Sequence, residues 1–132
     1  MATTHLSFAK RLAALPAGER RLLAAWTGAA LVALALGVAF GLATARARFG
    51  LAGGDVESGY RLLTLHGVTA FFYWLYFAQG AVLLAISAAF AGDEPRLALA
   101  PLGAVALGLM LAGLAANMAA ILGGPPLLYN AP

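Results

Sequence analysis

The sequence predicts an all-α membrane protein with three transmembrane helices in a single helical domain. Of the 132 residues, 63% are hydrophobic and only 10% are charged, and the mean hydropathy is +0.90. A soluble domain of this length needs far more polar surface. The charged residues fall in three short segments, and the uncharged runs that follow them are long enough for the ~20 residues of a membrane-spanning helix. The absence of cysteine excludes disulfides, thiolate metal sites and covalent haem attachment.

Residues 1–21 are predicted to be a short basic leader that precedes the first span. Three of its apolar residues can share one face of a helix lying on the membrane surface: Leu6, Ala9 and Leu12. Pro16 and Gly18 then predict a turn. His5 also lies in this leader, and because no second ligand accompanies it we interpret it as a solvated terminal histidine.

The first span is predicted at about residues 22–45, an uncharged run of 24 residues. Basic residues precede this run, as they do in a signal peptide. However, the run is far longer than the ~7–15 residues of a signal-peptide core, so we interpret it as a retained membrane helix. Gly37 and Gly41 lie four residues apart on one face of this helix. That spacing allows the backbone of a second helix to approach closely.

The second span is predicted at about residues 62–91 and the third at about 98–122. Residues 46–61, which contain four glycines and mixed charges, are predicted to form the loop before the second span. The polar segment 92–96 is predicted to be the turn before the third. Pro101 then falls in the first turn of the third helix, where a missing N–H is tolerated.

The distribution of Lys and Arg predicts the orientation of the chain. The leader and the 92–96 turn carry five of these residues, whereas the 46–61 loop and the C-terminal segment carry three. Because basic residues favour the cytoplasmic side, we expect an N-in, C-out arrangement that places His66 near the outer face. The basic residues lie at the ends of the spans and not in a patch interleaved with aromatics. They therefore indicate topology, and we expect no nucleic-acid partner.

His66, near the start of the second span, is the residue most indicative of chemistry. An ionisable side chain within a membrane span is energetically costly and by default suggests a functional site. Neutral imidazole is a common ligand of metals, including haem iron. The spacing alone leaves a second interpretation open, in which His66 only donates a hydrogen bond between helices, worth ~1 kcal/mol.

The residues after His66 predict how a cofactor would be accommodated. At 100° per residue its helical stripe continues through four residues: Ala70, Tyr73, Phe77 and Gly80. Small residues at Gly67 and Ala70 would let a flat macrocycle lie close to the backbone, and Tyr73 would line the pocket below. Such aromatic stripes also occur in ordinary helix packing. Asn117, in the third span, is interpreted as a helix–helix contact.

The segment Thr64-Leu65-His66-Gly67-Val68 resembles the start of helix II in subunit I of the haem–copper oxygen reductases, and looks most like the B-type branch of cytochrome c oxidases. The Gly37-x-x-x-Gly41 region and Leu128-Tyr129 are in register with the same resemblance. It covers essentially the whole sequence but only helices I–III, the N-terminal part, of the family's subunit I. The resemblance implies that His66 is an axial ligand of a low-spin haem, of a- or b-type.

The resemblance also implies a multi-pass protein of the bacterial inner membrane. In the complete enzyme, electrons from cytochrome c enter through a copper-carrying subunit II, and O₂ reduction is coupled to proton translocation. The family's other low-spin ligand, its copper-binding histidines and its high-spin haem ligand lie on later helices, and this sequence does not contain them. Copper and high-spin haem are therefore expected only with the remaining helices of subunit I, and this chain alone is expected to be inactive. We expect it to be a split gene product, a truncated chain or a fragment.

Three alternatives remain open at the level of sequence. A nitric oxide reductase of the same superfamily shares the low-spin haem arrangement. A small non-enzymatic membrane protein, such as an accessory or assembly subunit, would use His66 structurally. In a haem-carrying dimer, two copies would each give His66 to one b-type haem.

Overall fold

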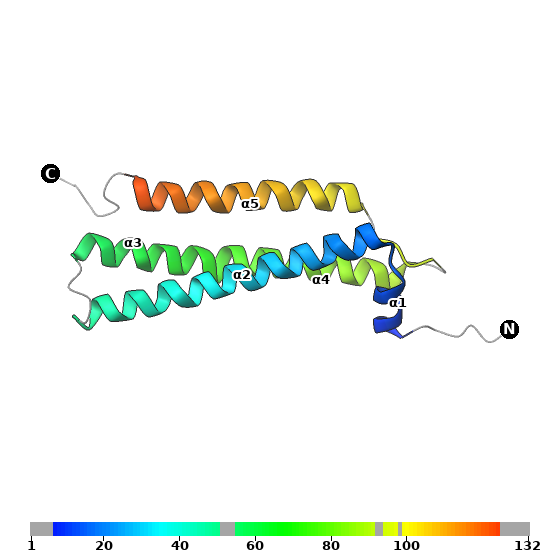
Figure 1. Cartoon of the computed structure of the whole chain (residues 1–132), viewed down its shortest axis with the longest axis horizontal. Helices are drawn as coiled ribbons and strands as arrows, with labels where there is room; N and C mark the ends of the chain where they lie inside the picture. The colour runs from blue at the N-terminus through cyan, green and yellow to red at the C-terminus, as the bar shows by residue number, and fades with distance from the viewer. Residues whose placement is uncertain (1–6, 51–54, 92–93, 98, 125–132) are drawn as a thin grey trace.

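The computed structural model describes residues 7–50, 55–91, 94–97 and 99–124, and these residues form helices without any strand (Figure 1). The elements in chain order are α1 (Phe8–Ala14), α2 (Ala17–Arg48), α3 (Val56–Gly67), η1 (Val68–Tyr73), α4 (Trp74–Phe90) and α5 (Ala100–Gly123). The segment η1 is π-helical and joins α3 to α4 as one continuous rod. This rod runs antiparallel to α2 and α5; in Figure 1 α5 lies along one side of it, whereas α2 lies on the other side beside α3 and crosses α4 toward the start of α5.

The chain is an all-α, multi-pass membrane protein, as predicted. Three helices are long and apolar enough to cross a bilayer: α2 with 32 residues, the α3–η1–α4 rod with 35 and α5 with 24. Large apolar side chains such as Leu42, Phe71 and Leu102 are exposed on these helices. Exposure of this kind is expected for surfaces that face lipid, where an apolar side chain costs nothing.

The spans begin and end close to the predicted positions, but the first two helices extend further into the polar segments. The predicted loop 46–61 is wrong at both ends, because its first residues complete α2 and residues from Val56 onward form α3. Asp55 caps α3 by accepting a 2.6 Å hydrogen bond from the backbone N–H of Ser58. Basic residues in the last turn of α2 stabilise its C-terminal end, because their positive charge interacts favourably with the negative end of the helix dipole. Hydropathy therefore locates the membrane-spanning part and not the helix ends. Leu128-Tyr129 lie outside the described residues.

Trp26 of α2 is the centre of the largest core and links all three spans. Its ring meets Phe77 of α4 edge-on, with centroids 6.0 Å apart. Its indole Nε1 donates a 3.2 Å hydrogen bond to the carbonyl of Gly103 in α5. Gly80 of α4 leaves the space that the indole fills, since a Cβ at this position would clash with the ring. The other buried members of this core are Ala30, Ala33, Leu107 and Leu114.

A second core closes the end of the molecule at which α2 and α5 begin. It consists of Leu15, Ala88 and Leu97, and Leu12 packs against it from α1, the amphipathic helix predicted in the leader. Leu6, the first residue of the predicted apolar face, lies outside the described residues, and Ala9 is exposed. The short helix α1 is therefore attached to the bundle through its C-terminal half.

Polar contacts fix the connection between α4 and α5 at this same end. The carboxylate of Glu19, in the first turn of α2, accepts a 2.6 Å hydrogen bond from the backbone N–H of Leu97 and lies 3.5 Å from the guanidinium of Arg96. Arg11 of α1 donates a 2.6 Å hydrogen bond to the carbonyl of Ala91 at the end of α4. Arg11 thus pairs a carbonyl that the end of α4 leaves without a partner, and Glu19 pairs a backbone N–H of the connecting segment.

At the opposite end of the molecule, Arg61 of α3 pairs with backbone carbonyls at the end of α5. Its guanidinium donates to the carbonyl oxygens of Ile121 and Gly124, the latter at 2.8 Å, and so holds the C-terminal end of α5. Glu57, one turn earlier on α3, orients Arg61 through a 2.9 Å ion pair. The last carbonyls of a helix have no partner within the helix, and a cation there also complements the helix dipole.

Candidate functional site

His66 is directed toward α2, where it meets the Gly37 and Gly41 pair. Its Nδ1 lies 2.7 Å from the carbonyl oxygen of Gly37. A Cβ added at Gly41 would lie only 2.9 Å from Nδ1 and 3.0 Å from Cε1, so Gly41 provides the room that the imidazole occupies. The two glycines thus have different tasks: the first supplies the hydrogen-bond acceptor and the second makes space for the ring.

The hydrogen bond to Gly37 determines the chemistry available at the other ring nitrogen. A carbonyl oxygen can only accept, so Nδ1 carries the hydrogen and Nε2 of the neutral ring presents a free lone pair. Nε2 has no hydrogen-bond partner among the described residues. In the same part of the chain, no fully buried side-chain nitrogen or oxygen lacks a partner, so Nε2 is not fully buried. His66 therefore combines an oriented ring with an electron-pair donor that is not enclosed by the described residues.

This arrangement has the form of a single metal ligand with its supporting contact. Histidines that bind metals usually donate their other N–H to a carbonyl or carboxylate, which fixes the tautomer and raises the basicity of the ligating nitrogen. Among the described residues there is no cluster of three or more His, Cys, Asp or Glu side chains that could hold an ion. A metal bound at His66 would thus need its remaining ligands from a cofactor, from other helices or from a second chain.

The π-helical turn η1 begins one residue after Gly67 and changes the direction of the side chains that follow His66. Thr69, fully buried in this turn, donates a 2.6 Å hydrogen bond to the carbonyl of Leu65. Its hydroxyl also lies 3.4 Å from the carbonyl of His66. The wider turn breaks the regular pairing of backbone groups, and the threonine hydroxyl gives these carbonyls a partner.

Because of this turn, the residues predicted to share one helical face with His66 do not all lie on the same side of the rod. Ala70 stays beside His66 and packs on Gly37, where an added Cβ would lie 2.5 Å from the Cβ of Ala70. Its small size is therefore used in the contact with α2. Tyr73 instead faces α5, where its hydroxyl accepts a 3.2 Å hydrogen bond from Nδ2 of Asn117. Asn117 thus makes the predicted helix–helix contact.

The other predicted site residues take separate positions. Gly67 is exposed, and nothing lies within 4 Å of where its Cβ would be, so the surface beside His66 is open there. Phe77 and Gly80 return to the α2 side and contact Trp26. Of the four residues predicted to bind a cofactor, His66 and Ala70 lie together at the α2 contact, Gly67 borders them, and Tyr73 lies apart.

A groove of about 800 Å³ separates the rod from α5, and Tyr73 lies on its wall. The groove is mostly apolar, with Tyr76, Gln79 and Asn117 as further polar residues, and His66 does not line it. The predicted pocket formed jointly by His66 and Tyr73 is therefore not a feature of the described residues.

Two features around His66 escape sequence reasoning. The partner of His66 is a backbone carbonyl, which every residue carries, so no residue type marks Gly37 as the acceptor. The π-turn likewise has no distinctive composition. The one available signal is the coincidence of a four-residue glycine spacing with a histidine in the neighbouring span.

Comparisons with models of protein families, with curated proteins and with solved structures find no match to this chain.

Proposed function

We propose that this chain is the N-terminal, three-helix part of subunit I of a terminal respiratory oxidase of the haem–copper superfamily, in which His66 provides one axial ligand of the low-spin haem. The observation that supports this proposal is the difference between the two imidazole nitrogens: Nδ1 is held by the Gly37 carbonyl, while Nε2 has no partner among the described residues and is not fully buried. A low-spin haem, when bound, supplies one-electron transfer.

The residues of this chain have defined tasks in the proposal. The carbonyl of Gly37 fixes the tautomer of His66 and keeps Nε2 basic, and Gly41 admits the ring to that position. Gly67 leaves the neighbouring surface open. The buried Thr69 stabilises the π-turn directly after the ligand, and π-turns of this kind occur frequently at functional sites. The second axial ligand and the oxygen-reducing centre belong to the remaining helices of subunit I.

The proposal includes the cellular setting expected from the sequence. The chain would lie in a bacterial inner membrane with its N-terminus in the cytoplasm, beside a copper-carrying subunit II that receives electrons from cytochrome c, and the complete enzyme would couple O₂ reduction to proton translocation. The Lys and Arg count supports this orientation. Reporter fusions at residue 54 and at the C-terminus should then read periplasmic, and one at residue 94 cytoplasmic. A cytoplasmic signal at residue 54 would reject the orientation.

The spectrum of the membrane complex isolated through a tag on this chain tests the ligand. His66→Ala should remove or shift the low-spin haem signal, because the iron loses an imidazole. His66→Gly with added imidazole should recover part of that signal, whereas His5→Ala, which changes the leader histidine, should leave it unchanged. A six-coordinate low-spin spectrum that persists in His66→Ala would reject the assignment.

A non-enzymatic accessory subunit is the second candidate, and the same hydrogen bond favours it. An interhelical histidine with a purely structural role would also donate to a backbone carbonyl. In that case the isolated wild-type complex should contain no haem bound through this chain. The only effect of His66→Ala should then be a loss of about 1 kcal/mol of stability. The haemochrome spectrum of the wild-type complex separates the two candidates.

A further inference from the structure

Helix α4 carries a row of exposed side chains at the spacing of a coiled-coil seam. Five residues form this row, which we call the heptad face: Tyr76, Gln79, Leu83, Ile86 and Phe90. Successive members are alternately three and four residues apart, so they follow the repeat of 3.5 residues that keeps one side of a helix against a partner. The spacing predicts left-handed packing against another helix, at a crossing angle near +20°. Neither α2 nor α5 covers the row, since all five side chains are exposed.

Gln79, within this row, is a polar side chain near the centre of the membrane. The rod and α5 are antiparallel, and the hydrogen bond between Tyr73 and Asn117 gives their register. Counting from this bond at about 1.5 Å per residue in both helices places Gln79 opposite the middle of α5, beside Leu109 and Met110, which line the same groove. At that depth the hydrocarbon of the lipids offers no hydrogen-bond partner.

The amide of Gln79 is exposed and has no hydrogen-bond partner among the described residues. The surroundings of this amide are helix interiors: Gln79, Leu109 and Met110 lie roughly 15 Å or more along their helices from the nearest residue outside the described ranges. By contrast, the exposed Thr27 of α2 is paired within its own helix, where it donates a 3.0 Å hydrogen bond to the carbonyl of Leu23. The donors and the acceptor of the Gln79 amide are thus left for a molecule outside the described residues.

The groove beside the heptad face has room for the side chains of another helix. It measures about 800 Å³, is mostly apolar and lies between the rod and α5. Tyr76, Gln79 and Leu83 line it from α4, and Gly113, which has no side chain to fill it, lines it from α5. An occupant must therefore be apolar along most of its length and offer a hydrogen bond at the depth of Gln79. A membrane-spanning helix that carries one amide meets both conditions.

We propose that α4 packs against the α4 of a second copy of this chain through the heptad face, so that the two Gln79 amides hydrogen-bond to each other. Copies inserted with the same topology lie parallel in the membrane and place equal residues at equal depth. Because an amide both donates and accepts, a second Gln79 satisfies the first in both directions, whereas a lipid acyl chain leaves it unpaired. A single polar residue in an apolar seam also fixes the register of such a pair. His66 is directed toward α2 and lies outside the heptad face, so this inference does not rest on the haem assignment.

Disulfide cross-linking of single-cysteine variants of the full chain in membranes tests the pairing, because the chain contains no cysteine of its own. Leu83→Cys and Ile86→Cys place a thiol on the heptad face, and each should form a disulfide-linked dimer with a membrane-permeant oxidant. Val82→Cys is the matched control, since Val82 is similarly exposed on α4 but lines a different groove, beside α2. It should not cross-link. Equal behaviour of all three variants, or cross-linking of the heptad face only to a different protein, would overturn the proposal.

The affinity of the pair tests the role of Gln79. Energy transfer between two fluorescently labelled populations of the full chain in detergent micelles gives the dissociation constant. Gln79→Leu keeps a side chain of similar size but removes the hydrogen bonds, and should weaken the dimer about tenfold. Gln79→Asn, which keeps a shorter amide, should retain part of the affinity. A wild-type chain that stays monomeric, or a Gln79→Leu variant that dimerises as tightly as wild type, would overturn the proposal.

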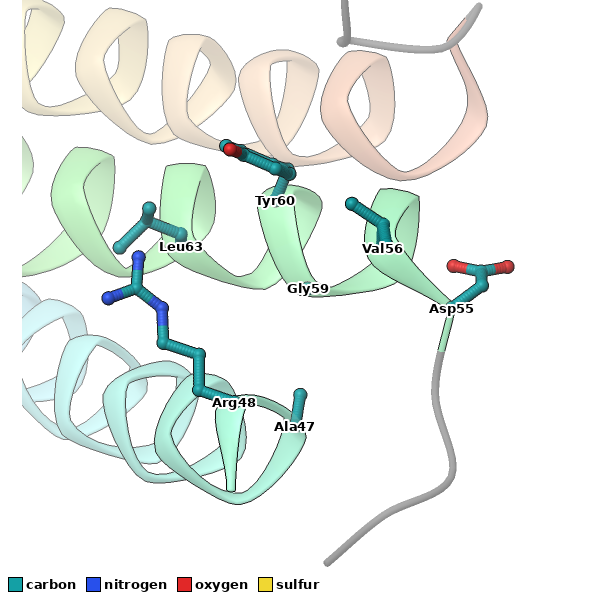
Figure 2. Close-up of a pocket in the computed structure, with 7 residues that line it drawn as sticks. All are labelled: Ala47, Arg48, Asp55, Val56, Gly59, Tyr60 and Leu63. Carbon is teal, nitrogen blue, oxygen red and sulfur yellow. The ribbon is translucent and has the colours of Figure 1, made fainter. Parts of the chain in front are cut away.

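Two tyrosine variants locate the contact on the heptad face. Tyr76 and Tyr60 are about equally exposed, at 52% and 45%. Tyr76 belongs to the heptad face, whereas Tyr60 lines a separate pocket of about 400 Å³ at the end of the bundle where α2 finishes and α3 begins, shown in Figure 2. Tyr76→Ala removes an aromatic contact from the pair and should weaken the dimer about fivefold. Tyr60→Ala should leave the dissociation constant unchanged, and equal effects of the two substitutions would also overturn the proposal.

Discussion

The two interfaces of the α3–η1–α4 rod are built differently. Toward α2, three glycines cannot carry a Cβ without a clash: Gly37 lies against the backbone of Ala70, Gly41 against the His66 ring and Gly80 against the Trp26 ring. Toward α5, the glycines are less constrained: Gly108 faces open space, a Cβ at Gly103 would meet only ordinary van der Waals neighbours, and a Cβ at Gly113 would meet only the Tyr73 hydroxyl, at 3.3 Å. Helix α5 is instead attached at separate points, through Trp26, through Asn117 and through Arg61.

The difference shows that glycine content alone does not predict a close helix contact in this protein. Both α2 and α5 are rich in Gly and Ala, yet only in α2 would an added Cβ clash with the rod, with the backbone of Ala70 at Gly37 and with the His66 ring at Gly41. The distinguishing feature is the four-residue spacing of Gly37 and Gly41, which keeps both on one face, whereas the five-residue spacing of Gly103, Gly108 and Gly113 turns each to a different direction. The candidate ligand His66 lies in the tight interface, where a ring can be held in one orientation.

The largest effect is expected from Gly37→Ala. Its new Cβ would lie 2.5 Å from the Cβ of Ala70 and 2.7 Å from its Cα, so the helices must separate and the His66 hydrogen bond lengthens. We expect a loss of about 3 kcal/mol in the free energy of unfolding, the upper range for overpacking. Reversible unfolding in mixed detergent micelles provides the measurement.

Gly108→Ala is the matched control on α5. Because nothing lies within 4 Å of its Cβ position, we expect no loss and a gain of up to ~1 kcal/mol from helix propensity. Equal destabilisation by the two substitutions would show that the two interfaces are equally tight and would refute the comparison.

A smaller effect is expected from Arg61→Met, which tests the attachment of α5. The substitution keeps an apolar stem but removes the hydrogen bonds to the carbonyls of Ile121 and Gly124. Hydrogen bonds from a charged group typically contribute ~2 kcal/mol, and we expect a loss of that order. Backbone amides near the C-terminal end of α5 should exchange with solvent faster, while those of α2 near Gly37 keep their protection.

Arg46→Met is the control for this experiment, since Arg46 is an exposed cation at the same end of the molecule and makes no hydrogen bond or ion pair with α5 among the described residues. It should leave exchange in α5 unchanged. If Arg61→Met also left exchange in α5 unchanged, the side-chain attachment of this helix would be wrong.

The sequence predicted the parts of this fold that depend on hydrophobic length. Three uncharged runs gave the number of spans, and Pro101 correctly marked the first turn of α5. The start of α3 was missed because capping by Asp55 and the ion pair between Glu57 and Arg61 stabilise helix in a segment rich in glycine and charge. Local polar contacts of this kind outweigh composition in deciding where a helix begins.

The candidate site was predicted only in part, for a different physical reason. Extrapolation at 100° per residue holds from His66 to Ala70 and fails at Tyr73, because η1 has more residues per turn than an α-helix. No residue pattern in the segment Val68–Tyr73 predicts a π-helical turn. The Gly37 carbonyl that orients His66 is a tertiary contact between residues 29 positions apart, and periodicity within one helix cannot reveal it.

The smallest expected effect concerns pH and is confined to the first turn of α3. The pKa of Asp55 is lowered from 3.8, first by the backbone hydrogen bond from Ser58, then by the Ser58 side chain, and least by the charge of Arg61. A carboxyl whose pKa falls on folding stabilises the folded state fully above its unfolded pKa, and this contribution is lost as the pH falls from about 3.8 through the lower folded value. The chemical shift of the Ser58 amide should therefore titrate with a midpoint below 3.8. In Asp55→Asn the cap persists without a titrating group, so this transition should disappear while the helix remains. Arg61→Met should raise the midpoint only slightly, since its charge is the weakest of these causes.

A midpoint at or above 3.8 in the wild-type chain would mean that the hydrogen bond from Ser58 to Asp55 does not persist in solution. Because the Asp55 cap contacts neither Gly37 nor Ala70, both interfaces of the rod should be unaffected over the same pH range.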